Sequence, residues 1–145
     1  MFESIKTPEE LMKIGKGEKW QVFEKLVAHI FEEHGFKTIQ NKVIVFSSKK
    51  KRQYDVIAEE TTRVYLVECK KWSNGRYKSS ALKKSVLDHY KRAYLYKEIT
   101  SKPIIPLLVT LHQEDILFHE RIPLVPIEKL NTFLLTINDY SLEEL

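Results

Sequence analysis

The sequence predicts an α/β fold in which helices cover both faces of a central mixed β-sheet. Three consecutive segments are rich in β-branched and aromatic residues, and a helical segment then precedes a wholly apolar strand. The resulting order is helix, helix, three strands, helix, two strands and helix, which is typical of layered α/β folds. The chain has 145 residues, of which 43% are hydrophobic and 30% charged, so we expect one ordered domain.

Two helices are expected before the first strand. Thr7 is suited to cap a short helix, because Pro8 and Glu10 would then occupy favoured positions in its first turn. A longer helix is expected from about residue 18 to residue 34, where Gly35 ends it. Its apolar residues recur at helical spacing: Trp20, Phe23, Val27, Ile30 and Phe31. We expect residues 1–16 to be a helical extension, 17–110 the core, and 111–145 a C-terminal strand and helix.

The three strands are expected at residues 36–46, 52–60 and 63–72. Apolar residues on both faces of the second and third strands indicate a sheet covered on each side. A two-residue turn at Thr61 and Thr62 would set Asp55 directly opposite Glu68, whereas a three-residue turn would shift the pairing by one and separate them.

The second half of the chain predicts a helical crossover into a parallel strand. A helix is expected from Ser79 or Ser80 to about Glu98, and its apolar stripe leaves the basic residues facing outward. The stripe consists of Leu82, Val86, Tyr90, Ala93 and Tyr94, and the outward residues are Lys83, Lys84, Lys91 and Arg92. Residues 104–110 then form a buried strand parallel to the third. A short strand at 122–126 and a last helix from Pro126 to about Ile137 complete the order.

Positive charge is concentrated in the middle of the sequence. The net charge is +4, but residues 47–92 contain thirteen Lys/Arg against five Asp/Glu. Such asymmetry attracts a polyanion, since Lys and Arg contacts to phosphate supply most of the affinity for nucleic acid that does not depend on sequence. A solvated lysine-rich face is the alternative, and charge alone does not decide between them.

Charged residues interrupt two strands that otherwise look buried. Two carboxylates facing each other, Asp55 and Glu68, repel, and burial adds a desolvation cost that a cation between them would offset. Mg²⁺ suits such a sparse site, because one or two carboxylates, waters and a substrate phosphate commonly complete its shell. Lys70, on the same face as Glu68, could hold that phosphate. The alternative is that Asp55 and Glu68 are ordinary strand residues, but local violations of the pattern tend to mark functional sites.

Other polar residues give weaker signals. Glu24 lies at the edge of the apolar stripe of the long helix, where it either reaches the site or is solvated like Glu32. Cys69 is the only cysteine, so an intramolecular disulfide is excluded, and alternation places it on the face opposite Glu68, as a small core residue. The histidines show no pair spaced for zinc on one helix, and the tyrosines at helical spacing, such as Tyr90, are more typical of core than of base stacking.

These motifs resemble the PD-(D/E)xK nuclease superfamily, most strongly its Mrr-type and archaeal Holliday-junction-resolvase-like branches. The resemblance spans about residues 17–110 and rests on Asp55 in QYDVIA, on Glu68-Cys69-Lys70 as the E-x-K element, and on Glu24 in FEKLVA. It departs from the family motif at Tyr54, where the family's name-giving proline is often replaced. The resemblance implies a restriction-endonuclease-like fold.

The resemblance also implies roles for these residues. Asp55 and Glu68 would be metal ligands, Glu24 a further ligand directly or through water, and Lys70 the activating or charge-stabilising lysine. The implied reaction is hydrolysis of DNA phosphodiester bonds with Mg²⁺ or Mn²⁺, in repair, recombination or restriction. The basic residues expected to contact DNA are Lys49, Lys50, Lys51, Arg52, Lys71, Arg76, Lys78, Lys83 and Lys84.

Two rival functions stay open: a catalytically silent nucleic-acid-binding module, and a complex-forming subunit on the same fold. A domain this small would benefit from a homodimeric partner to cut two strands. No apolar run reaches the ~20 residues of a membrane span and the N-terminus lacks the layout of a signal peptide, so we expect a cytoplasmic protein without a membrane partner.

Overall fold

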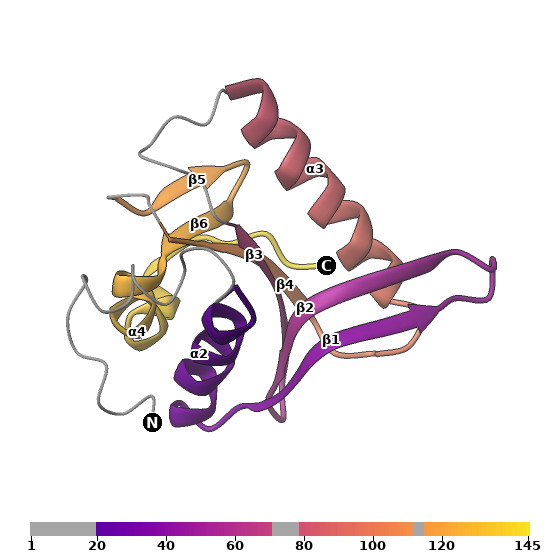
Figure 1. The fold of residues 1–145 in the computed structure, drawn as a ribbon, viewed down its shortest axis with the longest axis horizontal. Helices are drawn as coiled ribbons and strands as arrows, with labels where there is room; N and C mark the ends of the chain where they lie inside the picture. Colours follow the sequence, from indigo (N-terminus) through magenta and orange to yellow (C-terminus); the bar gives the residue numbers. More distant parts are fainter. Residues whose placement is uncertain (1–19, 71–78, 112–114) are drawn as a thin grey trace.

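The computed structural model describes residues 20–70, 79–111 and 115–145. Across these ranges it has a six-stranded mixed sheet in the order β1-β2-β3-β4-β6-β5 (Figure 1). The strands are β1 (Lys37–Val45), β2 (Lys51–Glu59), β3 (Val64–Lys70), β4 (Ile104–Thr110), β5 (Leu117–His119) and β6 (Ile122–Pro126). The helices are α2 (Trp20–Glu33), α3 (Ser79–Tyr96) and α4 (Ile127–Leu135), and a 3₁₀ turn, η3 (Ile137–Asp139), follows.

The predicted strands and their directions are confirmed. β1, β2 and β3 form an antiparallel meander, and the α3 crossover makes β4 a parallel neighbour of β3. The sequence analysis did not predict β5, which pairs antiparallel with β6. Glu120 and Arg121 connect these two strands with positive φ angles of 49° and 68°, the conformation that a tight hairpin turn requires. The helix expected at Thr7 lies outside the described residues.

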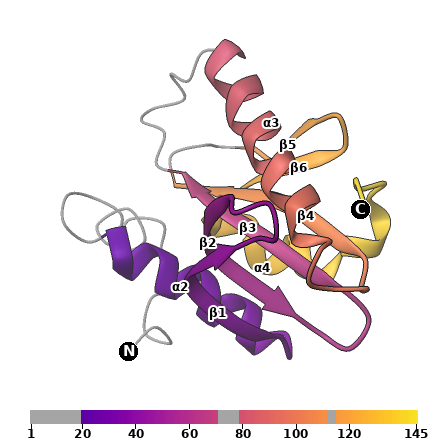
Figure 2. The ribbon, with the colours of Figure 1, turned by 90° about the vertical axis from the view of Figure 1, so that its right-hand side faces the viewer.

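Helices cover both faces of the sheet. α2 and α4 pack on one face around the largest apolar cluster, which includes Phe31, Tyr65 and Phe133. On the opposite face α3 packs over Leu66 and Leu108 in two smaller clusters. Figures 1 and 2, a quarter turn apart, both show α3 across the strands from α2. No helix within the described ranges has the length and apolar character needed to cross a membrane.

The buried line of α3 differs from the predicted stripe. Val86, His89 and Ala93 are its fully buried residues, whereas Tyr94 is 62% exposed. The helix is therefore rotated relative to the prediction, because His89 takes a place in the packing against β3. This rotation turns Arg92 toward the sheet instead of outward, which corrects the expectation for that residue. The last helix also begins one residue later than predicted, at Ile127, since Pro126 still belongs to β6.

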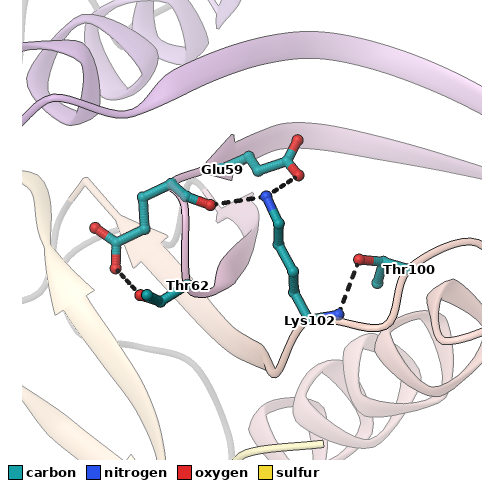
Figure 3. A network of polar contacts seen from close by, with 5 residues as sticks. Glu59, Thr62, Thr100 and Lys102 are labelled. Carbon is teal, nitrogen blue, oxygen red and sulfur yellow. Dashed lines mark hydrogen bonds and ion pairs between the residues drawn. The ribbon is translucent and has the colours of Figure 1, made fainter.

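A polar network fixes the turn between β2 and β3 (Figure 3). The Glu60 amide donates to the Arg63 carbonyl at 3.0 Å, so Thr61 and Thr62 form the two-residue turn that the sequence predicts. Lys102 Nζ reaches across from the segment before β4 and donates to a Glu59 carboxylate oxygen at 2.6 Å and to the Glu60 carbonyl at 2.9 Å. The register that follows pairs Val56 with Val67 and Glu59 with Val64.

The regular alternation of β2 breaks at Asp55. The ladder between β1 and β2 includes the pairs Gln40–Val56 and Lys42–Tyr54 but skips the pair between them, where Asn41 has a φ of +52°. Tyr54 and Ile57 both lie in the cluster on the α3 face although they are three residues apart, while Val56 lies in the cluster under α2. The side chains that precede Asp55 on β2 are therefore reversed. Each points to the face of the sheet opposite to the one that regular alternation would give it. Breaks of this kind re-aim a strand and are common next to active sites.

Candidate active site

Asp55 and Glu68 meet where β2 separates from β3. Continuing the ladder by one residue beyond Val56–Val67 sets Asp55 opposite Glu68, as the sequence predicts. The backbone amide of Cys69 donates to Oδ2 of the Asp55 carboxylate at 2.9 Å, instead of to a backbone carbonyl of β2. The break in β2 thus turns this carboxylate toward the end of β3, where Glu68 and Lys70 project.

Burial and like charge both act on Asp55. Desolvation raises the pKa of its carboxyl to about 6, the charge of Glu68 adds to the rise, and the hydrogen bond from the Cys69 amide opposes it. Glu68 itself is only 8% exposed. Its Oε2 lies 3.3 Å from Lys70 Nζ and 3.6 Å from Arg92 Nη1. The site therefore combines two acids, one of them destabilised as an anion, with two flanking cations.

These groups open into a hollow of about 570 Å³ between α2 and α3. Its lining comes from five elements, α2, β1, β2, β3 and α3, and consists of Gln21, Glu24, Asn41, Gln53, Asp55, Glu68 and Arg92. Glu24 is 5% exposed, so α2 delivers this carboxylate to the hollow instead of to solvent. Gln53 Nε2 donates to Asn41 Oδ1 at 3.2 Å and ties β2 to β1 at the rim.

Two buried groups lie behind the acids. His89 Nε2 is 2.7 Å from the Leu66 carbonyl, which can only accept, so the ring carries its hydrogen on Nε2. Burial lowers the pKa of His89 to about 4, which keeps the ring neutral at physiological pH. Cys69 is fully buried in the core under α2, and desolvation raises the pKa of its thiol well above the usual value. The prediction that Cys69 is a core residue on the opposite face from Glu68 is therefore confirmed.

The chemistry of the donors fits a hard divalent cation. Adjacent carboxylates, one with a raised pKa, are a set that such a cation stabilises. Among the described residues, no three Asp, Glu, His or Cys side chains form a group with metal-binding geometry. Asp55 and Glu68 would thus hold the ion with water and phosphate oxygens, and Glu24 would act from the wall of the hollow.

The predicted DNA-contacting residues fall into three groups. Lys49, Lys50, Lys51 and Arg52 lie at the outer end of the β1–β2 hairpin, and the first three are exposed. Lys83 and Lys84 are exposed near the start of α3, and Lys83 lines a different hollow, together with His119 and Arg121. Lys71, Arg76 and Lys78 lie outside the described residues.

Sequence reasoning missed part of the lining. Arg92 was placed on the outer side of α3, and no local signal shows that the helix turns it toward Glu68. Nothing in the sequence marks Asn41 or Gln21 as part of the lining of this hollow. Gln53 reaches the lining because the alternation of β2 reverses at Asp55, which the sequence does not reveal.

Comparisons with known proteins agree with this fold. Residues 16–96 match the family model Mrr_cat, described as a restriction endonuclease. An uncharacterised protein of Archaeoglobus fulgidus is 31% identical over 125 residues, which cover 86% of this chain and 96% of the relative.

Solved structures show the same architecture. The crystal structure of AF1548, a protein of unknown function, is 26% identical, with a TM-score of 0.50 over 62% of this chain and 46% of that chain. VC1899 from Vibrio cholerae is 13% identical, with a TM-score of 0.51 over 83% of this chain and 33% of that one. The small subunit (R.BspD6I2) of the heterodimeric restriction endonuclease R.BspD6I is 15% identical, with a TM-score of 0.54 over 89% and 77%.

The chain spans less than half of the first two solved structures. The two structures with the lower identities support the fold alone, and with it the predicted restriction-endonuclease-like architecture. The family model covers more than half of the chain, and the archaeal relative matches it over most of its length. This protein therefore belongs to the Mrr_cat restriction endonuclease family.

Proposed function

We propose that this protein is a metal-dependent endodeoxyribonuclease. The observation that carries the proposal is the meeting of Asp55 and Glu68 at the break in β2, with Lys70 and Arg92 beside them. Family membership supports nuclease chemistry, and the two acids supply the ligands that it needs. A homodimer that cuts both strands of DNA in repair, recombination or restriction is consistent with the small size of the domain.

Each residue has a distinct part in the proposed reaction. Asp55 and Glu68 would hold Mg²⁺ or Mn²⁺, and Glu24 would orient a water molecule from the wall of the hollow. A divalent ion held there would supply an activated water nucleophile and would neutralise charge on the phosphate. Lys70 stabilises the negative charge that develops on the phosphate as the water attacks and the leaving oxygen departs. Arg92 adds a second cation on the side of α3.

A cleavage panel tests the proposal. Linear duplex, branched and single-stranded DNAs are incubated with Mg²⁺ or Mn²⁺, with the Asp55→Asn protein as the inactive control. The wild-type protein should cut at least one substrate only when the metal is present, and Asp55→Asn should cut none. If the wild-type protein binds DNA but cuts nothing in the panel, the function is that of a silent binding or complex-forming module.

A further inference from the structure

Among the residues that the structure describes, α3 covers one face of the outer part of the β1–β2 hairpin, residues 41–54, and the other face has no such cover. On the α3 side Phe46 and Tyr54 are buried, at 4% and 2% exposure, and the Tyr54 ring packs against Tyr96. The Tyr54 hydroxyl donates to the Arg92 carbonyl at 2.7 Å. At the tip, Ser47 Oγ donates to Glu98 Oε1 at 2.7 Å. The outer hairpin is therefore braced against α3 and cannot swing freely.

Its other face exposes two aliphatic side chains beside polar ones. Val43 is 45% exposed and Val45 is 66% exposed. Their partners across the ladder are Gln53 and Lys51, and Gln53 also lines the hollow that holds Asp55. The break at Asn41 and Asp55 gives these valines their direction. Without the break, regular alternation would place Val43 on the same face as Ile39. That is the α3 face, because Ile57, the partner of Ile39, lies in the cluster under α3.

The electrostatic character of the hairpin is uniformly positive. Residues 37–54 contain six Lys/Arg and no Asp or Glu. Within the described part of the chain, Lys49, Lys50 and Lys51 form no ion pair, so their charge is available to a polyanion. At a strand rise of roughly 3.3 Å per residue, Lys49 lies about 20 Å from Asp55 along the hairpin. This distance corresponds to about six base pairs of duplex.

The exposed residues favour duplex over single-stranded nucleic acid. Proteins that hold single strands offer aromatic side chains on which bases stack. The aromatic residues of the outer hairpin, Phe46 and Tyr54, are both buried on the α3 face. The open face instead offers small aliphatic groups at its centre and cations at its end, which suit the base and sugar edges of a groove and the phosphates beside it.

We propose that the open face of the outer hairpin is a second DNA-contact surface, which docks a duplex arm next to the scissile phosphate. This inference rests on the proposed nuclease function. Val43 and Val45 lie against a groove, while Lys51 on the same face and Lys49 at the tip contact phosphates, Lys49 about six base pairs from the cut. The substrate therefore needs duplex on that side of the cleavage site.

Paired serine substitutions test the surface. The Val43→Ser/Val45→Ser double variant is compared with Ile39→Ser, which alters an equally exposed residue of β1 on the other side of the break. Fluorescence anisotropy in EDTA measures binding to a duplex of about 20 base pairs and to the corresponding single strand, with the duplex length chosen to exceed the six base pairs that the hairpin spans. Thermal unfolding confirms that both variants are folded.

The double variant should bind the duplex about fivefold to tenfold more weakly, with single-strand binding unchanged and Ile39→Ser close to wild type. Wild-type duplex affinity in the double variant, or an equal loss on single strands, would overturn the inference. The cleavage panel separates this result from the proposed function. If the wild-type protein cuts nothing while the double variant still loses duplex affinity, only the nuclease function is contradicted. If the wild-type protein cuts DNA with metal while the double variant keeps its duplex affinity, only the hairpin surface is contradicted.

Discussion

At the scale of single residues, Asp55 is destabilised as an anion by its place in the fold. An aspartate placed in solvent ionises near its usual pKa, but burial and the charge of Glu68 raise the pKa of Asp55 to about 6. The ionised form therefore costs free energy in the folded protein. One hydrogen bond from the Cys69 amide offsets part of this cost. A residue that destabilises the apo fold in this way is expected where a cation is bound.

Replacing Asp55 by Asn should abolish metal-dependent cleavage without weakening the metal-free fold. The asparagine side chain keeps an oxygen that can accept from the Cys69 amide, but it removes the repulsion of Glu68. Below about pH 3 Asp55 is protonated in both the folded and unfolded states, so the two proteins should be equally stable. Between about pH 4 and pH 6 the unfolded chain releases a proton that folded Asp55 keeps, so the wild-type protein alone loses stability across this range, and the loss is complete above about pH 6. At pH 7.5 the variant should be more stable by about 3 kcal/mol.

Urea unfolding in EDTA at the two pH values measures this difference, and the DNA panel measures activity. A variant that loses stability as pH rises, relative to wild type, would show that the Asp55 charge is stabilised by the fold. Cleavage at the wild-type rate would remove Asp55 from the site.

Lys70→Ala should separate metal binding from catalysis. Lys70 Nζ lies 3.3 Å from Glu68 Oε2, so it is beside a proposed ligand without being proposed as one itself. Its removal should leave the calorimetric affinity for Mn²⁺ within about threefold and lower the cleavage rate by roughly two orders of magnitude, the usual scale for one charge-stabilising donor. A loss of metal affinity as large as the loss of rate would show that Lys70 acts by positioning Glu68.

At the scale of secondary-structure elements, the sequence predicted what depends on neighbours along the chain. Strand alternation and the two-residue turn at Thr61 and Thr62 determine the register of β2 and β3, and the structure shows that register. Because Asp55, Glu68 and Lys70 lie on this hairpin, their meeting follows from local pattern. The short β5 carries too few residues for a pattern to be visible.

What the sequence could not predict depends on packing between distant elements. The rotation of α3 is set by His89, a polar residue that an apolar stripe does not include but that packs fully buried against the Leu66 carbonyl. This rotation brings Arg92 to Glu68 and exposes Tyr94. The break at Asn41 and Asp55 is also invisible in the sequence, because an aspartate within a strand does not reveal that the alternation reverses there.

Helix α2 leads to a prediction at this scale. Its apolar stripe packs on the sheet through Phe23 and Val27, and this packing carries Glu24 into the hollow, at 5% exposure. Glu24→Gln should therefore lower the cleavage rate by at least tenfold, while Glu32→Gln, an exposed position of the same helix, should change it little. Circular dichroism and thermal unfolding check that the helix is retained. Equal effects of the two substitutions would show that Glu24 serves the fold and not the reaction.

At the scale of the whole molecule, charge is distributed so that one region attracts phosphate. Residues 47–92 carry most of the cations, while the rest of the sequence is net negative. In the fold, the outer end of the β1–β2 hairpin and the start of α3 present Lys side chains on the surface. Long-range attraction of this kind accelerates encounter with DNA and weakens as salt screens it.

Removing the charge of the hairpin should change how salt controls binding. Each phosphate contact by Lys or Arg contributes about 0.9 to the slope of log affinity against log salt on duplex DNA, since it releases a condensed counterion. The variant with Lys49, Lys50, Lys51 and Arg52 all replaced by Ala should bind more weakly at low salt and show a slope smaller by about two to four. Replacing Lys129, which pairs with Asp115 beside α4, is the matched control and should leave the slope unchanged. Anisotropy titrations in EDTA across a series of NaCl concentrations give both slopes. If the slope of the fourfold variant equals that of wild type, the hairpin does not contact the phosphate backbone, and the affinity must come from other cations such as those of α3.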